Sequence, residues 1–395
     1  MKKLLGKIHM KDDMKILIKF LFSILVMVPI LSKANDKLIY SSDFKSEYYL
    51  YDVSINQKKY RFMLDTGSGF TVLDTKIADE VSKKITEQDY YLPVTKLISA
   101  HNHKNDIQYY HSPTIFLGQE QIYTSAVIAL DLSHLEAVLG EKIDGILGID
   151  VFNQFIWEVD NHNGKLNIYK DKKIKKDYKN VISYRADDYP YFKLYKKNKS
   201  KDLNKQWITL HFALDTGAVN SSLDPIIKNH IIVNNYNNKN LIRNSVDFMN
   251  KTEFSDLVFV QDLEFGNEPP IKRMNFIYSK INKNLLGLDF FDRFDRFIFY
   301  PFKQKFYYNE MSSNSDPEPR RMIGVKNNDG LIELVYNDQI YLNSFGLENG
   351  DVIELVNNKK YTSQEIHLVR KILNLSKDVH LKVKRGDKIL FLILD

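Results

Sequence analysis

The stretch FMLDTG at residues 62–67 returns as FALDTG at residues 212–217, which is 150 positions further along the chain. Each copy is an apolar run that leads into an Asp-Thr-Gly turn, and a Leu-Asp pair follows at the same offset, at Leu73-Asp74 and at Leu223-Asp224. Each Asp therefore comes where an apolar strand opens into a turn, and the Gly permits a tight backbone there. One such turn is a weak signal, but two in the same context indicate an internal duplication.

A second repeated signal lies downstream of each turn. LGIDVF at residues 147–152 is echoed by LGLDFF at residues 286–291. Each echo precedes a predicted β-hairpin, at residues 156–169 and 297–308, and alternating segments before each Asp-Thr-Gly predict further hairpins. Because the order of signals is the same in both halves, we expect a mainly β fold built from two tandem units.

Two such turns that face each other would bring the carboxylates of Asp65 and Asp215 within hydrogen-bonding distance. Like charges that close do not both ionise, so the pair would share one proton. The ionised member can take a proton from water while the protonated member donates to a carbonyl oxygen. Such a pair hydrolyses an amide without a metal ion or a covalent intermediate, and we expect no cofactor.

The motifs FMLDTGSGFTVLD and FALDTGAVNSSLD, each with a downstream LGID or LGLD, resemble the aspartic protease superfamily. Within it, the chain resembles the bacterial retropepsin-like aspartyl proteases, with two lobes fused as in pepsin. The resemblance covers about residues 45–310. It implies two tandem retropepsin-like β lobes in one pepsin-like bilobal unit, an aspartic-type endopeptidase activity, and Asp65 and Asp215 as the catalytic residues.

The resemblance also implies supporting roles around the two aspartates. Thr66 and Thr216 match the threonines whose hydroxyls lock the two turns together. Gly148 and Gly287 match the glycine of the segment that packs behind each turn, where a missing side chain suits close backbone approach. The residues expected to support the catalytic turns are Thr66, Gly67, Ser68, Thr216, Gly217 and Ala218.

The residue after each Asp-Thr-Gly differs, and this predicts an asymmetric pair. Ser68 matches the pepsin-like residue that hydrogen-bonds its neighbouring aspartate, whereas Ala218 has no hydroxyl to do so. A lost hydrogen bond to a carboxylate raises its pKa. We therefore expect Asp65 to be the more readily ionised member.

A glycine-rich flap, the mobile hairpin that covers substrate in this family, is not evident in the sequence. Residues 92–111 lie where the flap of the first lobe is expected, with the tip near residues 101–105. His101, His103 and His111 fall in the same segment, and a polar loop explains them better than a metal site. We assign no metal ligands.

The composition changes beyond the second unit. Residues 312–321 (SSNSDPEPRR) predict a polar linker, and GLENGDVI at residues 346–353 precedes a helix that Thr362 can cap. This order resembles a bacterial PDZ domain, a small α+β domain that adds an extended peptide to a sheet edge and holds its C-terminal carboxylate. The residues that resemble its carboxylate-binding loop are Ile323, Gly324 and Val325. The alternative is a small structural domain with no accessible groove.

The net charge of +6 is concentrated at the N-terminus. Residues 1–34 hold seven lysines and two aspartates, a balance of +5, and the other 361 residues carry +1. The lysines, the apolar residues 20–31 and the small residues before position 35 predict a cleaved signal peptide, with a retained N-terminal anchor as the alternative. We expect export to the periplasm or cell envelope and no nucleic-acid partner. The chain has no cysteine, which excludes disulfides, thiol nucleophiles and cysteine-ligated metals.

Three hypotheses follow from these patterns. The first is an exported, monomeric aspartic endopeptidase that cleaves peptide or protein substrates and recruits a peptide or partner through the PDZ-like domain. The second is an inactive protease fold that serves as an envelope peptide-binding or scaffolding protein. The third is that each lobe pairs with the same lobe of another chain. The predicted order is signal peptide, first lobe, second lobe, linker and PDZ-like domain, at residues 1–34, 35–175, 176–311, 312–321 and 322–395.

Overall fold

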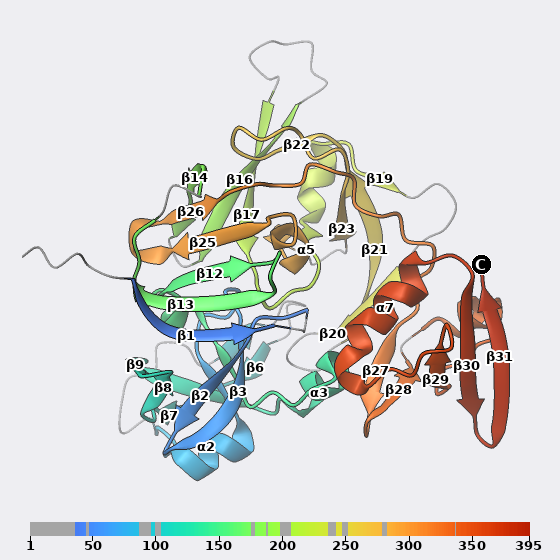
Figure 1. Cartoon of the computed structure of the whole chain (residues 1–395), viewed down its shortest axis with the longest axis horizontal. Coiled ribbons are helices and arrows are strands. Elements are labelled where there is room, and N and C mark those ends of the chain that lie inside the picture. The colour runs from blue at the N-terminus through green and yellow to red at the C-terminus, as the bar shows by residue number, and fades with distance from the viewer. Residues whose placement is uncertain are drawn as a thin grey trace, which may run out of the picture.

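The computed structural model is mainly β, as the sequence predicts, with sheets of six, eight, ten and five strands and one two-stranded sheet (Figure 1). The predicted signal peptide lies outside the described residues, so that prediction is untested. Among the helices that the structure describes, none is long and apolar enough to cross a membrane. The described residues are 36–44, 47–86, 96–98, 104–174, 178–186, 189–197, 207–235, 242–246, 252–278, 283–335 and 337–395.

The first half of the chain, residues 36–174, builds the eight-stranded sheet. Its strands in sheet order are β7 (Gln108–His111), β10 (Ala126–Leu130), β4 (Val72–Asp74), β11 (Gly145–Leu147), β3 (Lys58–Leu64), β2 (Leu50–Ile55), β8 (Ile115–Leu117) and β9 (Glu120–Ile122). β3 runs parallel to β11, with Leu64 opposite Leu147. Because β3 ends at Leu64, Asp65 is the first residue beyond a strand in the middle of the sheet.

The second half, residues 178–311, repeats this arrangement in the ten-stranded sheet. The strands along its main path are β15 (Arg185–Ala186), β16 (Pro190–Lys197), β17 (Trp207–Leu214), β24 (Leu285–Leu286), β18 (Ser222–Leu223), β23 (Met274–Tyr278), β21 (Thr252–Val260) and β19 (Asn234–Asn235). β20 (Ile242–Val246) pairs with β21, and β22 (Leu263–Glu264) pairs with β16. β17 runs parallel to β24, with Leu214 opposite Leu286, so Asp215 occupies the place that Asp65 has in the first half.

A six-stranded sheet joins the two halves. Its strands in sheet order are β1 (Lys37–Asp43), β13 (Lys165–Asp171), β12 (Ile156–Asp160), β25 (Arg296–Tyr300), β26 (Lys305–Tyr308) and β14 (Asn180–Ser183). β12 of the first half pairs antiparallel with β25 of the second, with Trp157 opposite Phe299. The two hairpins predicted after the repeated LGID and LGLD signals are present as β12–β13 and β25–β26.

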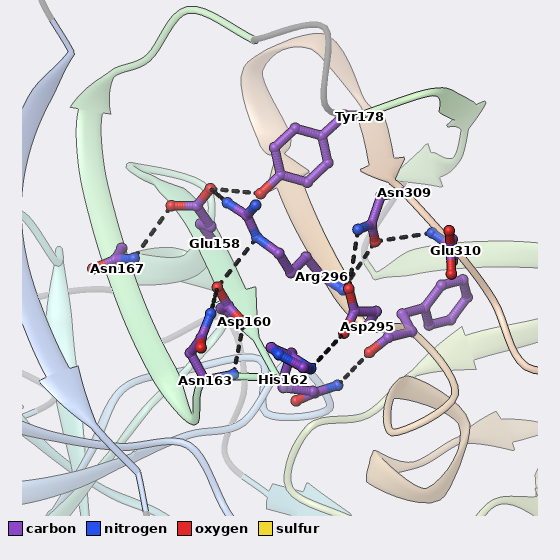
Figure 2. A network of polar contacts seen from close by, with 12 residues as sticks. Glu158, Asp160, His162, Asn163, Asn167, Tyr178, Asp295, Arg296, Asn309 and Glu310 are labelled. Carbon is purple, nitrogen blue, oxygen red and sulfur yellow. Dashed lines mark hydrogen bonds and ion pairs between the residues drawn. The ribbon is translucent and has the colours of Figure 1, made fainter.

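Charged side chains cross this shared sheet (Figure 2). The Glu158 side chain is only 5% exposed, and it accepts a hydrogen bond from the Tyr178 hydroxyl and pairs with Lys172 at 3.4 Å. Arg296 lies 3.7 Å from Glu158 and 3.2 Å from Asp160. Burial alone would raise the pKa of Glu158, but the hydrogen bond from Tyr178 and the charge of Lys172 lower it. The buried Glu158 carboxylate on β12 is therefore paired with positive charges, and its pair with Arg296 on β25 links strands from both halves.

The repeated Leu-Asp pairs supply two helix N-caps. Asp74 accepts a hydrogen bond of 3.0 Å from the Lys76 N–H at the start of a helix, and Asp224 accepts one of 2.8 Å from the Ile226 N–H. Both satisfy an N–H group that has no partner within the helix. The short helices of the two halves are α2 (Thr75–Val81), α3 (Ser133–Leu139), α4 (Ile149–Phe152), η2 (Pro225–Asn229), α5 (Leu288–Phe291) and η3 (Pro301–Lys303).

A hairpin lies in the segment where the flap is predicted. β5 (Lys96–Ile98) pairs antiparallel with β6 (Lys104–Asp106), with Leu97 opposite Asn105. Most of the predicted tip, including His101 and His103, lies outside the described residues. His111 ends β7, which is a separate strand of the eight-stranded sheet.

Residues 322–395, here called the C-terminal unit, form the five-stranded sheet and have a hydrophobic core of their own. The helix α7 buries Ile366, Val369 and Leu373, which share one face at the spacing of an amphipathic helix. At the predicted cap, the Thr362 N–H donates to Glu365 at 3.0 Å. The elements of the unit are β27 (Val325–Asn328), β28 (Leu331–Leu334), α6 (Gln339–Asn343), β29 (Val352–Val356), η4 (Ser363–Glu365), α7 (Ile366–Leu375), β30 (Val379–Arg385) and β31 (Lys388–Leu394).

Candidate active site

The sheets hold the backbones of Asp65 and Asp215 in equivalent positions. The Asp65 N–H donates to the Leu147 carbonyl, and the Asp215 N–H donates to the Leu286 carbonyl, both at 2.9 Å. Each aspartate is therefore fixed by the strand that carries the downstream LGID or LGLD signal. This pairing explains why the two signals recur together in the sequence.

The threonines of the two turns interlock across the molecule. The Thr66 hydroxyl donates to the Leu214 carbonyl at 2.7 Å and accepts from the Thr216 N–H at 3.1 Å. The Thr216 hydroxyl donates to the Leu64 carbonyl at 2.8 Å and accepts from the Thr66 N–H at 3.1 Å. Both threonines are almost completely buried. These four hydrogen bonds tie each turn to the strand that leads into the other.

The glycines of the turns make room for the carboxylates. A Cβ atom on Gly67 would lie 2.7 Å from the Asp215 Cγ, and a Cβ atom on Gly217 would lie 2.4 Å from the Asp65 Cγ. Both distances are shorter than real side chains allow, so each aspartate packs directly on the opposite glycine. The two carboxyl groups lie close enough to change each other's pKa. The structure thus brings Asp65 and Asp215 together as a pair.

The pair is electrostatically asymmetric. Burial raises the pKa of Asp65, while hydrogen bonds from the Gly67 N–H (2.8 Å) and the Ser68 N–H (3.1 Å) oppose the rise. Burial also raises the pKa of Asp215, and the negative charge of Asp65 drives it well above its usual range. Two carboxyl groups in contact do not both ionise, so the pair holds one proton. The rise is larger at Asp215 than at Asp65, which is the direction that the sequence predicts.

The prediction that the Ser68 hydroxyl bonds Asp65 is wrong. The Ser68 hydroxyl donates to the Phe70 carbonyl at 2.8 Å, and only its backbone N–H reaches Asp65. The side chain is satisfied two residues further along its own loop. In the second half, Ala218 has no hydroxyl, and its N–H opposes the pKa rise of Asp215. The asymmetry of the pair therefore does not come from the Ser68 hydroxyl.

Gly148 and Gly287 lie directly behind the two turns. A Cβ atom on Gly148 would lie 2.5 Å from the Phe70 carbonyl, and one on Gly287 would lie 2.7 Å from the Ala218 carbonyl oxygen. A backbone hydrogen bond lies next to this contact, since the Ile149 N–H donates to the Ser68 carbonyl at 2.9 Å. The expected close approach of backbones is present at both glycines.

Two carboxyl groups that the sequence analysis did not single out stand behind the turns. Asp150 accepts from the Thr71 hydroxyl at 2.8 Å, and Asp289 accepts from the Ser221 hydroxyl at 2.6 Å and from its N–H. The Ser221 hydroxyl also accepts from the Gly287 N–H at 3.1 Å. Burial raises the pKa of Asp150, and raises that of Asp289 to about 7. The sequence signal for these two carboxyl groups is the Asp that ends both LGID and LGLD.

The backbone of Ile323 and Gly324 is already occupied. The Ile323 N–H donates to the Asn374 side chain at 2.6 Å, and the Gly324 N–H donates to the Asn337 side chain at 2.7 Å. Val325 begins β27, and its carbonyl accepts from Arg370 at 3.0 Å. A PDZ-like loop holds a peptide carboxylate with free N–H groups. A carboxylate here would have to displace both asparagine side chains.

Among the residues that the structure describes, no cluster of three or more His, Asp or Glu side chains is placed to hold a metal ion. At the candidate site, Asp65 and Asp215 offer the chemistry of two interacting carboxyl groups that hold one proton between them.

Comparisons with known proteins address the first half most directly. None of the curated proteins matches the chain in sequence. The chain is similar to the solved structure of the aspartic proteinase from Irpex lacteus. The match covers 69% of this chain and 98% of the proteinase, with 11% sequence identity and a TM-score of 0.38. The family model described as "Aspartyl protease" matches residues 51–151. Over this segment, which holds Asp65, its turn and Gly148, the chain matches the aspartyl protease family.

Proposed function

We propose that this chain is an aspartic-type endopeptidase in which Asp65 and Asp215 share one proton and activate water. The observation that carries the proposal is the interlock of the two turns, since Thr66 and Thr216 fix both carboxyl groups against each other. The Asp65 carboxylate takes a proton from water, and the Asp215 carboxyl donates its proton to the carbonyl oxygen of the scissile peptide bond. The resulting tetrahedral intermediate collapses with loss of the amine.

The pKa directions of the pair give the proposal a pH dependence. Activity requires Asp65 to be ionised, so the rate rises as the pH rises through the pKa of Asp65. It also requires Asp215 to be protonated, so the rate falls as the pH rises through the strongly raised pKa of Asp215. A bell-shaped profile is expected, and its two limbs belong to the pair rather than to single residues.

The test is cleavage of fluorescently labelled, unfolded casein by the full chain between about pH 3 and pH 8. Asp65→Asn and Asp215→Asn should each lower the rate by about 10³-fold or more, because general acid–base catalysis is lost. Asp262→Asn is the matched control: its side chain is exposed on the second half, and the rate should not change. Circular dichroism shows that each variant is folded.

Retained cleavage in either catalytic variant would overturn the proposal. No turnover by the wild-type chain at any pH, together with peptide binding that Asp65→Asn does not alter, would favour the second hypothesis, an inactive protease fold that binds peptides.

We further propose that the chain is exported to a bacterial periplasm or cell envelope and acts as a monomer. The basic and apolar order of residues 1–34 supports export. Both aspartates come from one chain, which supports a monomer over pairing of equivalent lobes between chains. N-terminal sequencing of the mature protein tests the first point, and sedimentation of the active enzyme tests the second.

A further inference from the structure

Helix α3 of the first half ends directly against the C-terminal unit (Figure 1). Its C-cap is Gly140, which has a φ of +81° and closes the helix by donating to the Glu136 carbonyl. A Cβ atom on Gly140 would lie 1.9 Å from the Ser363 carbonyl oxygen and 3.0 Å from Ile366. The end of α3 therefore meets the backbone of η4 and the first side chain of α7 at contact distance.

Arg370 of α7 connects three segments at this contact. Its guanidinium donates to the Val138 carbonyl near the end of α3 and to the Val325 carbonyl at the start of β27. It also lies 3.9 Å from the Glu47 carboxylate. The last carbonyls of a helix have no partner within it, so a guanidinium is a suitable cap for them. β27 is an edge strand of the five-stranded sheet, and α3 lies beside it.

The charges around this contact are complementary. Burial raises the pKa of Glu141 in the first half and of Asp292 at the end of α5, and the charges of His367 and Lys371 on α7 oppose these two rises. Together with the pair of Arg370 and Glu47, one basic helix face meets acidic side chains from both halves. Such pairs fix the orientation of two surfaces more than they add affinity.

The segment that leads into the C-terminal unit is bonded to the second half as well. Residues 312–321, predicted as a polar linker, are bonded to the second half: Asp316 accepts from the Asn275 N–H at 2.7 Å and pairs with Arg293. Met322 packs against Leu257 of β21. The unit is thus held at two separate places, on the first half by Arg370 and on the second half by its linker.

We propose that the surface between the edge strand β27 and helix α7 is a docking site for α3 of the same chain, with Arg370 as its centre. The C-terminal unit is then held in a fixed position against the two halves. The edge of β27 is covered by α3 of the same chain, so it is not free to pair with a peptide strand. This inference does not depend on whether the aspartate pair is catalytic.

Hydrogen–deuterium exchange of the full chain tests this docking. In Arg370→Ala, amide exchange in peptides that cover α3 and β27 should become about tenfold faster or more. In the wild-type chain, local opening of this contact must break the two hydrogen bonds from Arg370 to backbone carbonyls, and the variant lacks these bonds. The control is Lys382→Ala, which removes a half-buried pair with Glu354 inside the same unit and should leave α3 unchanged. Unchanged protection of α3 and β27 in Arg370→Ala would overturn the proposal.

A second variant covers the case in which Arg370→Ala unfolds the C-terminal unit, seen as loss of protection in β30 and β31. Arg370→Met keeps the aliphatic stem but has no N–H to donate to the two carbonyls, which both accept from Nη2 of the arginine. Faster exchange of α3 with β30 and β31 still protected supports docking through the guanidinium. Wild-type exchange of α3 in this variant contradicts it.

Discussion

The turn at Asp65 and the turn at Asp215 use equivalent bonds, yet their carboxyl groups hold different protonation states. Each backbone is fixed by the neighbouring strand at 2.9 Å, and each threonine bonds the strand opposite. Burial, and then the charge of Asp65, nevertheless raise the pKa of Asp215 well above that of an ordinary carboxyl group. Because the two carboxyl groups are in contact, they do not both ionise, and the duplicated scaffold holds one proton between two equivalent turns.

The layer behind the turns repeats the same bonds in both halves. Thr71 donates to Asp150 through its hydroxyl and its N–H, and Ser221 donates to Asp289 through the same two groups. Burial raises the pKa of both carboxyl groups, and that of Asp289 reaches about 7. What differs behind the turns is therefore the pKa of the carboxyl group and not the bonds that hold it.

The largest expected effect concerns the threonine interlock, where the two halves should respond alike. Thr66→Val and Thr216→Val keep the shape of the side chain but leave a buried N–H and a buried carbonyl without their partner. Each variant should lose about 2–4 kcal/mol of unfolding free energy, since an unsatisfied buried polar group costs about 1–3 kcal/mol. Urea denaturation measures this loss, and Thr66→Ser, which keeps the hydroxyl, is the control. A clearly larger loss in one half would show that the interlock is not equivalent.

The next effect separates the halves through the pH dependence of stability. The folded pKa of Asp289 lies above its unfolded value, so the folded state binds the extra proton and the wild-type chain loses stability as the pH rises from about 4 to about 7. Asp289→Asn removes this titration, and its melting temperature should depend less on pH in that window. Thermal unfolding at several pH values measures it. Asp150→Asn should flatten the profile less, and an equal or greater flattening would contradict the difference between the halves.

The parts of the site that could be predicted are those that the duplication repeats. Asp65, Asp215 and the two threonines stand out because the same letters recur in the same context. The role of Asp150 could not be predicted, since its partner Thr71 lies 79 residues away and no local pattern links them. The same reason applies to the backbone of Ile323, which a side chain 51 residues away occupies. Long-range contacts of this kind follow from packing rather than from periodicity.

The smallest effect tests the one contact in the turn that the sequence predicts wrongly. Ser68→Ala removes the hydrogen bond to the Phe70 carbonyl and should cost about 0.5–1.5 kcal/mol of stability. It keeps the N–H groups of Gly67 and of residue 68, which are the donors to Asp65, so the acid limb of the pH–rate profile should stay in place. The pH dependence of casein cleavage by the variant measures this. An acid limb shifted upward by about one pH unit, equivalent to about 1.4 kcal/mol, would show that the hydroxyl stabilises the Asp65 charge in the working enzyme. The asymmetry of the pair would then arise from the Ser68 hydroxyl, which Ala218 lacks.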